Sequence, residues 1–275
     1  MPRDAIAHNR AAHDRHADVY DASHPEIFNP VEQARLEAAL ARAVREVADS
    51  PAVVRALDVG CGSGNLTRHL LALGARVTAA DLSTRLLDVT RRRFAGTGRL
   101  ETMTLNGTDL RPVPDATFDL VAAYSVLHHV PDYVALVTEM ARVTRPGGIV
   151  FFDHERSDES WVSASYRQFL REAVIWPRRR WWYWLQPHRY LKRLRAWFAW
   201  RSWLDPRWMP EGDLHIWPDD HIEWARIEGA LASAACTVVV REDYLAYEPR
   251  YQQSAWESWR ERASDMRLLI ARKDG

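Results

Sequence analysis

A glycine-rich turn between an apolar run and a helical pattern constrains the fold of this chain more than any other feature. Residues 53–59 are rich in valine and leucine, which is typical of a buried parallel strand, and leucines recur at helical spacing over 66–73. Gly60, Gly62 and Gly64 lie between the two segments. Glycine permits positive φ and lets a ligand approach the backbone. The pattern predicts a strand-to-helix loop that binds a polar ligand near the free N–H groups of the helix.

The spacing of the glycines and one acidic residue narrow the choice of ligand. Dinucleotide-binding loops carry G-x-G-x-x-G and bind a pyrophosphate. Here the glycines have the spacing G-x-G-x-G, and an acid of the strand, Asp58, lies just before them. A carboxylate there repels a pyrophosphate and attracts a cationic amino group. The stretch 57–66 resembles motif I of the class I S-adenosylmethionine-dependent methyltransferases; a glycine turn of some other α/β protein is the alternative. The resemblance implies that the methionine end of that cofactor is held by Asp58, Gly60, Cys61, Gly62 and Gly64.

Polar residues also follow the next expected strands, 75–80 and 100–105, at the sheet edge where open α/β proteins bind ligands. Asp81 is suited to accept hydrogen bonds from both hydroxyls of a ribose, and it equally suits the N-cap of the following helix. By resemblance, Leu82 lies beside the adenine, Asp109 accepts from its exocyclic amine and the Leu110 N–H serves its ring. Ser125, at the end of a fourth strand, faces the methionine part of the cofactor by the same resemblance.

Ionisable residues after the fourth and fifth strands are candidates for a general base. The segment 118–129 matches the pattern F-D-x-V-x-x-x-x-x-L-H-H of the small-molecule branch of that family. Methyl transfer from a sulfonium mainly requires alignment, and a base matters when the acceptor is a hydroxyl or an ammonium. His154, oriented by Glu155, is the first candidate, followed by His128 and Tyr20. A structural role for these histidines and a solvated turn at 153–155 are the alternatives.

Strand and helix patterns alternate five times before residue 157, which predicts a doubly wound α/β fold. We expect a mostly parallel, seven-stranded, Rossmann-like methyltransferase sheet whose seventh strand is antiparallel. The expected parts are an N-terminal helical lid over 1–50, a cofactor-binding core over 51–157, an α-helical insertion over 158–221, and a last helix with two strands over 222–275.

Histidines are crowded in the N-terminal segment, but their spacing is not that of a metal site. We interpret them as solvated or capping side chains. His215 and His221, with Asp219 and Asp220, either line the acceptor pocket, bind a metal or cap the next helix. The prediction from the sequence is that no metal is bound.

The segment 176–209 differs in composition from the rest of the chain. It holds eight tryptophans and nine basic residues against one acid, Asp205. Its centre, 188–198, is helical in period, with an aromatic apolar face opposite a basic one. Such a helix either roofs the acceptor pocket or makes peripheral contact with an anionic membrane surface.

Overall composition limits the remaining choices. The formal net charge is zero, so we expect no nucleic-acid partner. The two cysteines and the lack of 18 consecutive apolar residues favour a reducing cytoplasm, with membrane association through 176–209 left open. The sequence therefore predicts methyl transfer from S-adenosylmethionine to a small or lipid-linked acceptor at oxygen or nitrogen. The alternatives are a nicotinamide-dependent oxidoreductase and a non-catalytic cofactor-binding or membrane-docked protein.

Overall fold

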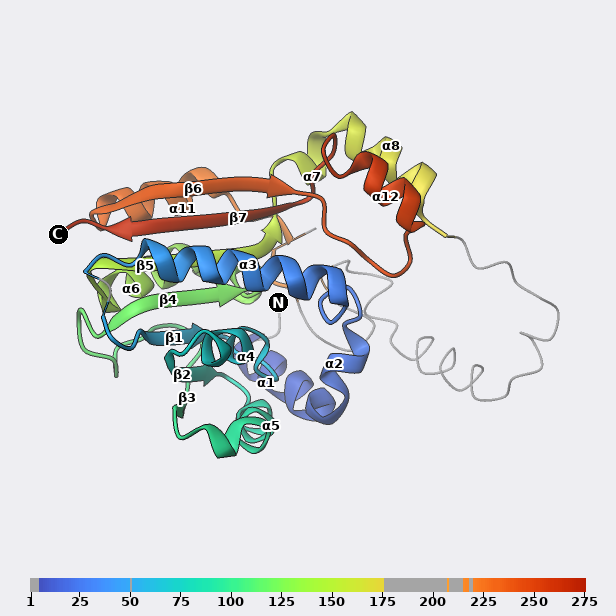
Figure 1. Ribbon diagram of the computed structural model, residues 1–275. Helices are drawn as coiled ribbons and strands as arrows, with labels where there is room; N and C mark the ends of the chain where they lie inside the picture. Colours follow the sequence, from blue (N-terminus) through green and yellow to red (C-terminus); the bar gives the residue numbers. More distant parts are fainter. Residues whose placement is uncertain (1–4, 50, 176–206, 208–214, 218–219) are drawn as a thin grey trace.

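A seven-stranded sheet forms the centre of the molecule (Figure 1). A computed structural model describes residues 5–49, 51–175, 207, 215–217 and 220–275. The strand order is β3-β2-β1-β4-β5-β7-β6, and only β7 runs antiparallel to its neighbours. This arrangement confirms the predicted doubly wound sheet. The strands are β1 (Arg55–Val59), β2 (Arg76–Asp81), β3 (Leu100–Thr104), β4 (Phe118–Tyr124), β5 (Thr144–Arg156), β6 (Cys236–Tyr244) and β7 (Met266–Lys273).

Alternating apolar residues of the central strands build a core on each face of the sheet. Leu120 and Ala122 of β4 pack with helices α3 (Pro30–Glu46) and α4 (Asn65–Ala72). Val121 and Ala123 pack on the other face with α6 (Tyr133–Val143) and α11 (Trp224–Ser233). A strand points successive side chains to opposite faces, so a continuous apolar run is buried on both. The fifth covering helix, α5 (Thr84–Phe94), packs on β2 and β3.

Short helices at the N-terminus cover the carboxyl ends of the parallel strands. Figure 1 shows α1 (Ala5–His16), η1 (Ala17–Val19) and α2 (Tyr20–Ser23) at the arrowhead end of β1 and β4. Polar contacts attach them to the β2–α5 region, so the expected N-terminal lid is present. These contacts are Arg10 Nε to the Leu82 carbonyl at 3.2 Å, Ser83 Oγ to Asp14 at 2.5 Å, Arg85 to Asp18 at 3.0 Å and Arg93 to Asp21 at 2.8 Å.

Two further helices follow β5, at the start of the expected insertion. They are α7 (Glu159–Val162) and α8 (Ala164–Ala173), and α8 packs against α12 (Gln253–Trp259) from the β6–β7 connection. The predicted aromatic and basic helix within 176–209 lies outside the described residues, apart from Arg207. No helix in the described part of the chain has the length and apolar character needed to span a bilayer.

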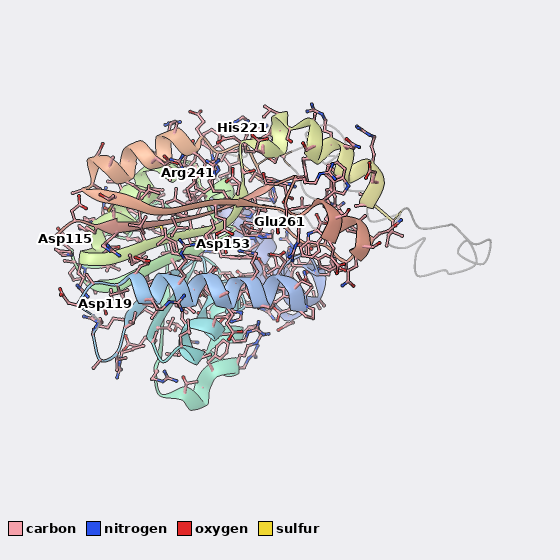
Figure 2. All side chains as sticks on the ribbon, turned by 45° about the horizontal axis from the view of Figure 1, so that its top comes forward. Asp115, Asp119, Asp153, His221, Arg241 and Glu261 are labelled. Atoms are coloured by element: carbon pink, nitrogen blue, oxygen red, sulfur yellow. The ribbon has the colours of Figure 1, made fainter. Side chains whose placement is uncertain are left out.

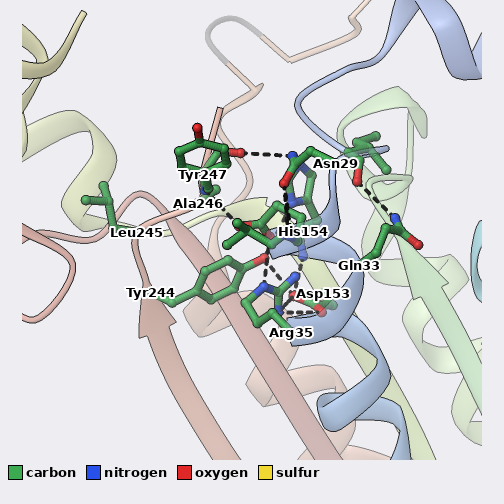
Figure 3. Close-up of polar contacts among 12 residues, drawn as sticks. Asn29, Gln33, Arg35, Asp153, His154, Tyr244, Leu245, Ala246 and Tyr247 are labelled. Carbon is green, nitrogen blue, oxygen red and sulfur yellow. Dashed lines mark hydrogen bonds and ion pairs between the residues drawn. The ribbon is translucent and has the colours of Figure 1, made fainter. Parts of the chain in front are cut away.

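A buried ion pair joins α3 to the end of β5 (Figure 3). Arg35 Nη1 donates to both carboxylate oxygens of Asp153, at 3.0 and 3.3 Å, and the Tyr244 hydroxyl donates to the same carboxylate at 2.9 Å. Asp153 has no solvent exposure and lies in the interior between α3 and the sheet (Figure 2). The pair fixes α3 beside the strand end that carries His154.

We expect Arg35→Met to lower the free energy of unfolding by about 3–5 kcal/mol, because it leaves the Asp153 charge buried without its cation. Arg42→Met on the same helix is the control. Arg42 lies 3.7 Å from Glu242 with both side chains about half exposed, so its loss should cost about 0–1 kcal/mol. Urea unfolding of the two variants beside the parent chain measures both values. Equal losses of unfolding free energy in the two variants would show that the buried ion pair stabilises the fold no more than the exposed one.

Candidate active site

The carboxylate of Asp58 replaces a missing helix cap at the glycine turn. Helix α4 begins after Gly64, which has no side chain to cap it. Asp58 Oδ2 instead accepts from the Thr67 N–H at 2.9 Å and from its hydroxyl at 2.6 Å. Asp58 also lines a small cavity of about 30 Å³ together with Gly60 and Tyr20. The predicted anchor for a cationic amino group therefore faces a cavity while it also holds the turn.

The three glycines of the turn all have positive φ, and two of them are enclosed by side chains. A Cβ on Gly60 would lie 2.5 Å from Val126 Cγ2, and one on Gly64 would lie 2.7 Å from the Phe94 ring. A Cβ on Gly62 would lie 3.6 Å from the Tyr20 ring of the lid. Cys61 packs its thiol against Ala79 and Leu87, and burial raises its pKa. The Cys61 N–H donates to the Ala80 carbonyl at 2.9 Å and its carbonyl accepts from the Gly64 N–H at 2.8 Å, so Cys61 holds the turn rather than offering its sulfur to a ligand.

Asp81 holds the two loops on either side of it. Its Oδ2 accepts from the Gly62 N–H at 2.8 Å and its Oδ1 from the Ser83 N–H at 2.7 Å. Ser83, whose hydroxyl accepts from the Leu86 N–H at 3.1 Å, is the N-cap of α5, so the alternative role considered for Asp81 is wrong. A carboxylate has about four acceptor positions, so both oxygens of Asp81 retain capacity for two ribose hydroxyls. Burial raises the pKa of Asp81.

A cavity of about 130 Å³ extends from the glycine turn past Asp81 to the loop after β3. Leu82, Asp109 and Leu110 line it, as does Ser125, whose φ is +58°. The Leu110 N–H donates to Glu139 Oε2 at 3.1 Å, so this group is engaged within the protein. The apolar walls of this cavity suit an adenine ring. The carboxylates at its edge, Asp81 and Asp109, suit the ribose hydroxyls and the amine of an adenosine. The apolar walls include Ile6, Leu82, Leu86, Leu105, Leu110, Val126 and Val130.

A second cavity, of about 190 Å³, shares His13, Tyr20, Ser125 and His129 with the first. Seven histidines line it, including three from the N-terminal segment. The three N-terminal histidines are half-buried and face this cavity, and their interpretation as solvated or capping side chains stays a prediction. The seven are His13, His16, His24, His128, His129, His154 and His215.

Glu155 orients His128 rather than its neighbour in sequence. Glu155 Oε1 accepts from the backbone N–H groups of Val126 and Leu127, at 2.6 and 2.7 Å, and its Oε2 lies 2.9 Å from His128 Nδ1. The expected pairing of Glu155 with His154 is therefore wrong. The backbone of His154 is left-handed and the strand register shifts between Phe152 and Glu155, so a bulge at 154 directs the side chain of 155 to the loop after β4 while that of 154 lies beside Tyr244.

His154 lies in a strongly electropositive and buried position. Its backbone has φ +60°, its ring stacks on Tyr124 at 4.8 Å, and its Nδ1 is 3.4 Å from the Tyr244 hydroxyl (Figure 3). Burial and the nearby Arg35 and Arg156 lower the pKa of His154 well below its usual value. His154 is therefore neutral at physiological pH and a weak proton acceptor.

The sequence motifs do not identify every residue that lines the first cavity. Ile6, Asn9 and His13 occupy positions i, i+3 and i+7 of α1 and all line the first cavity. That helical spacing is a signal that could have identified them. Glu139, which accepts from the Leu110 N–H, lies in a different helix and has no such signal. His215 lines the second cavity, whereas His221 stacks on Trp161 at 4.1 Å.

We expect the stability of the parent chain and of Asp58→Asn to diverge with pH. Burial, with the nearby Asp81 charge, raises the pKa of Asp58 to about 7 despite the hydrogen bonds from Thr67. The unfolded carboxyl ionises near pH 4, so the parent chain loses stability as pH rises from about 4 to about 7 and then levels off. The variant lacks this titration. Between pH 5 and pH 7 its unfolding free energy should gain roughly 2–3 kcal/mol relative to the parent, as measured by urea unfolding; parallel pH curves would contradict the assignment.

Comparison with known proteins agrees with this architecture. Residues 57–152 match the family model described as "Methyltransferase domain". A ubiquinone biosynthesis O-methyltransferase of Xanthomonas axonopodis is 36% identical over 137 residues, 48% of this chain and 54% of the relative. A malonyl-[acyl-carrier protein] O-methyltransferase of Serratia marcescens is 41% identical over 96 residues, 35% of this chain and 36% of the relative. The chain thus spans about half or less of the length of these curated relatives.

Solved structures share the fold over most of the chain. An S-adenosylmethionine-dependent methyltransferase from Mesorhizobium loti has a TM-score of 0.54 at 22% identity and covers 86% of this chain and 98% of its own. The [4+2]-cyclase SpnF has a TM-score of 0.54 at 16% identity, covering 88% and 81%. Together with the family match, these findings identify residues 57–152 as a methyltransferase domain with the class I fold.

Proposed function

We propose that this protein transfers a methyl group from S-adenosylmethionine to an oxygen or nitrogen atom of a small or amphipathic acceptor. The observation that carries the proposal is the junction of two cavities through four shared residues, His13, Tyr20, Ser125 and His129. One cavity has the carboxylate acceptors and the apolar walls that suit the cofactor, and the other has room and polar groups for a methyl acceptor. When bound, S-adenosylmethionine supplies an electrophilic methyl group.

The residues around the first cavity, with Asp58 in the small cavity beside the glycine turn, would hold the two ends of the cofactor. Asp58 would bind the ammonium of its amino acid, Asp81 the ribose hydroxyls and Asp109 the adenine amine. Tyr20 lies over Gly62, where it would exclude water from the reacting centre. Burying the cofactor between these groups aligns it with the second cavity, and alignment is the main requirement of a displacement at carbon.

Two imidazoles of the second cavity are candidates for accepting a proton from the acceptor. Glu155 on Nδ1 fixes the tautomer of His128 and raises the basicity of its other nitrogen, Nε2. His154 is neutral but weakly basic, so it is better suited to orient the acceptor through a hydrogen bond. The geometry therefore moves the first choice of base from His154 to His128, with Tyr20 at the junction of the cavities as a further candidate.

The names of the relatives favour oxygen as the methylated atom, since both specify O-methyl transfer. The sequence of 176–209 supports an amphipathic acceptor, because its tryptophans and basic residues suit either a roof over that acceptor or contact with an anionic lipid surface. Co-sedimentation with anionic liposomes, with and without this segment, separates the two roles. Equal sedimentation of both forms would remove the membrane role.

We expect the parent chain to bind S-adenosylhomocysteine and Asp81→Ala to bind it at least about 100-fold more weakly. The variant loses the acceptors for two ribose hydroxyls and also releases the Gly62 N–H, which together should cost about 3 kcal/mol or more. Isothermal titration calorimetry measures the affinities. Asp88→Ala, which removes an exposed acid of α5, is the matched control and should bind as the parent does.

The same titration distinguishes the competing functions. Binding of NAD in place of S-adenosylhomocysteine would contradict methyl transfer and support an oxidoreductase. Tight binding of S-adenosylhomocysteine, with no methylation of phenolic, carboxylate or amine acceptors under any condition, would favour a non-catalytic cofactor-binding protein.

A further inference from the structure

Three imidazoles converge at the wall of the second cavity. His128 and His129 lie in the short helix η3 (Leu127–His129), and His215 comes from the segment before α11. One ring nitrogen from each histidine lies within 4.8 Å of the other two. The ring centroids are 4.1 Å apart for His128 and His129, and 4.8 and 4.7 Å from them to His215.

The segment that carries His215 is attached to η3 by its own contacts. The Ile216 N–H donates to the His128 carbonyl at 3.2 Å, and Trp217 Nε1 donates to the Val130 carbonyl at 2.9 Å. Ile216 is buried. These bonds hold residues distant in the sequence in one place, so the cluster does not depend on the histidine rings alone.

A carboxylate lies against the same nitrogen of two of the three rings. Glu155 Oε2 is 2.9 Å from His128 Nδ1, and Asp220 Oδ1 is 2.5 Å from His215 Nδ1. A carboxylate on Nδ1 fixes the tautomer that leaves Nε2 as the ligand nitrogen, which is the usual arrangement around metal-binding histidines. Two independent carboxylate–histidine pairs that meet at one point favour a metal site over chance crowding.

The donor set also indicates which metal would bind. Imidazole suits Zn²⁺, Co²⁺, Ni²⁺ and Cu²⁺, whereas Mg²⁺ and Ca²⁺ prefer oxygen. Tetrahedral Zn²⁺ at 2.0–2.1 Å from each nitrogen would place the nitrogens roughly 3.3 Å apart. The three rings, whose nitrogens lie within 4.8 Å of one another, would therefore move closer together when the ion binds. Three protein ligands leave a fourth position open, as in catalytic rather than structural zinc sites.

We propose that His128, His129 and His215 bind one divalent, imidazole-preferring metal ion such as Zn²⁺, with the open coordination position toward the acceptor cavity. The ion would take an oxygen of the acceptor, a role that rests on the proposed methyl transfer; the site itself rests on the geometry alone. Because His129 also lines the cofactor cavity, that oxygen would lie near the junction of the two cavities. With His128 on the metal, its Nε2 no longer accepts the proton, and that role passes to another group of the second cavity, such as His154 or Tyr20. The proposal departs from the absence of metal expected from the sequence.

The test is direct binding of Co²⁺ to the full chain, purified without a histidine tag and stripped with a chelator. Equilibrium dialysis with elemental analysis gives the stoichiometry, and the visible spectrum of bound Co²⁺ reports its ligands. We expect one Co²⁺ per chain, displaced by Zn²⁺, and at least 100-fold weaker binding in His215→Ala and in His129→Ala. His221→Ala removes a histidine that stacks on Trp161 of α7 and should bind Co²⁺ as the parent does; Figure 2 labels His221 next to that helix.

Asp220→Asn tests the orienting carboxylate without removing a ligand. It should keep the stoichiometry and weaken Co²⁺ binding about 10–100-fold. Circular dichroism and S-adenosylhomocysteine titration of each variant show that the fold and the cofactor site persist, so failure of the metal site is distinguishable from failure of the proposed function. Substoichiometric Co²⁺ in the parent chain, or equal affinity in the parent, His215→Ala and His129→Ala, would overturn the proposal.

Discussion

Buried carboxylates at the ends of the parallel strands hold the loops on which both cavities depend. Four of these acids, Asp58, Asp81, Asp153 and Glu155, are each no more than 6% exposed. Each accepts hydrogen bonds from a different segment: Asp58 from α4, Asp81 from the glycine turn, Asp153 from α3 and Glu155 from the loop after β4. A buried charge is costly unless it is paired or hydrogen-bonded, so these contacts specify where the glycine turn, the loop after β4 and α3 lie relative to the sheet. One of them, Asp58, also faces the small cavity in which we propose that the ammonium of the cofactor binds.

The parts of the fold that could be predicted from the sequence are those in which neighbouring residues carry the signal. The run before Gly60 predicts a strand, the leucines after Gly64 predict a helix, and the alternation of such segments predicts the doubly wound sheet. The acids near the carboxyl ends of β1 and β2, Asp58 and Asp81, could be placed at one edge of the sheet because parallel strands end together. The seven-stranded order and its antiparallel β7 confirm this reasoning.

Contacts between distant segments could not be predicted in the same way. Glu155 and His154 are neighbours in sequence, yet the strand directs their side chains apart and Glu155 reaches His128. The N-terminal histidines carry no strand or metal spacing, and only the docking of the lid on the β2–α5 region brings them to the second cavity. His215 lies beside His128 and His129 because the Ile216 N–H donates to the His128 carbonyl, and no local sequence pattern predicts that hydrogen bond.

The most direct test of the central assignment, an ammonium of the cofactor on the Asp58 carboxylate, is the proton balance of cofactor binding. Burial raises the pKa of Asp58 to about 7, and an adjacent cation would lower it, so binding must expel a proton where Asp58 is protonated. Calorimetric titration of S-adenosylhomocysteine near pH 6, in buffers of different ionisation enthalpy, counts the protons released. The account predicts release of up to one proton by the parent chain and none by Asp58→Asn. Equal release by both proteins would contradict it.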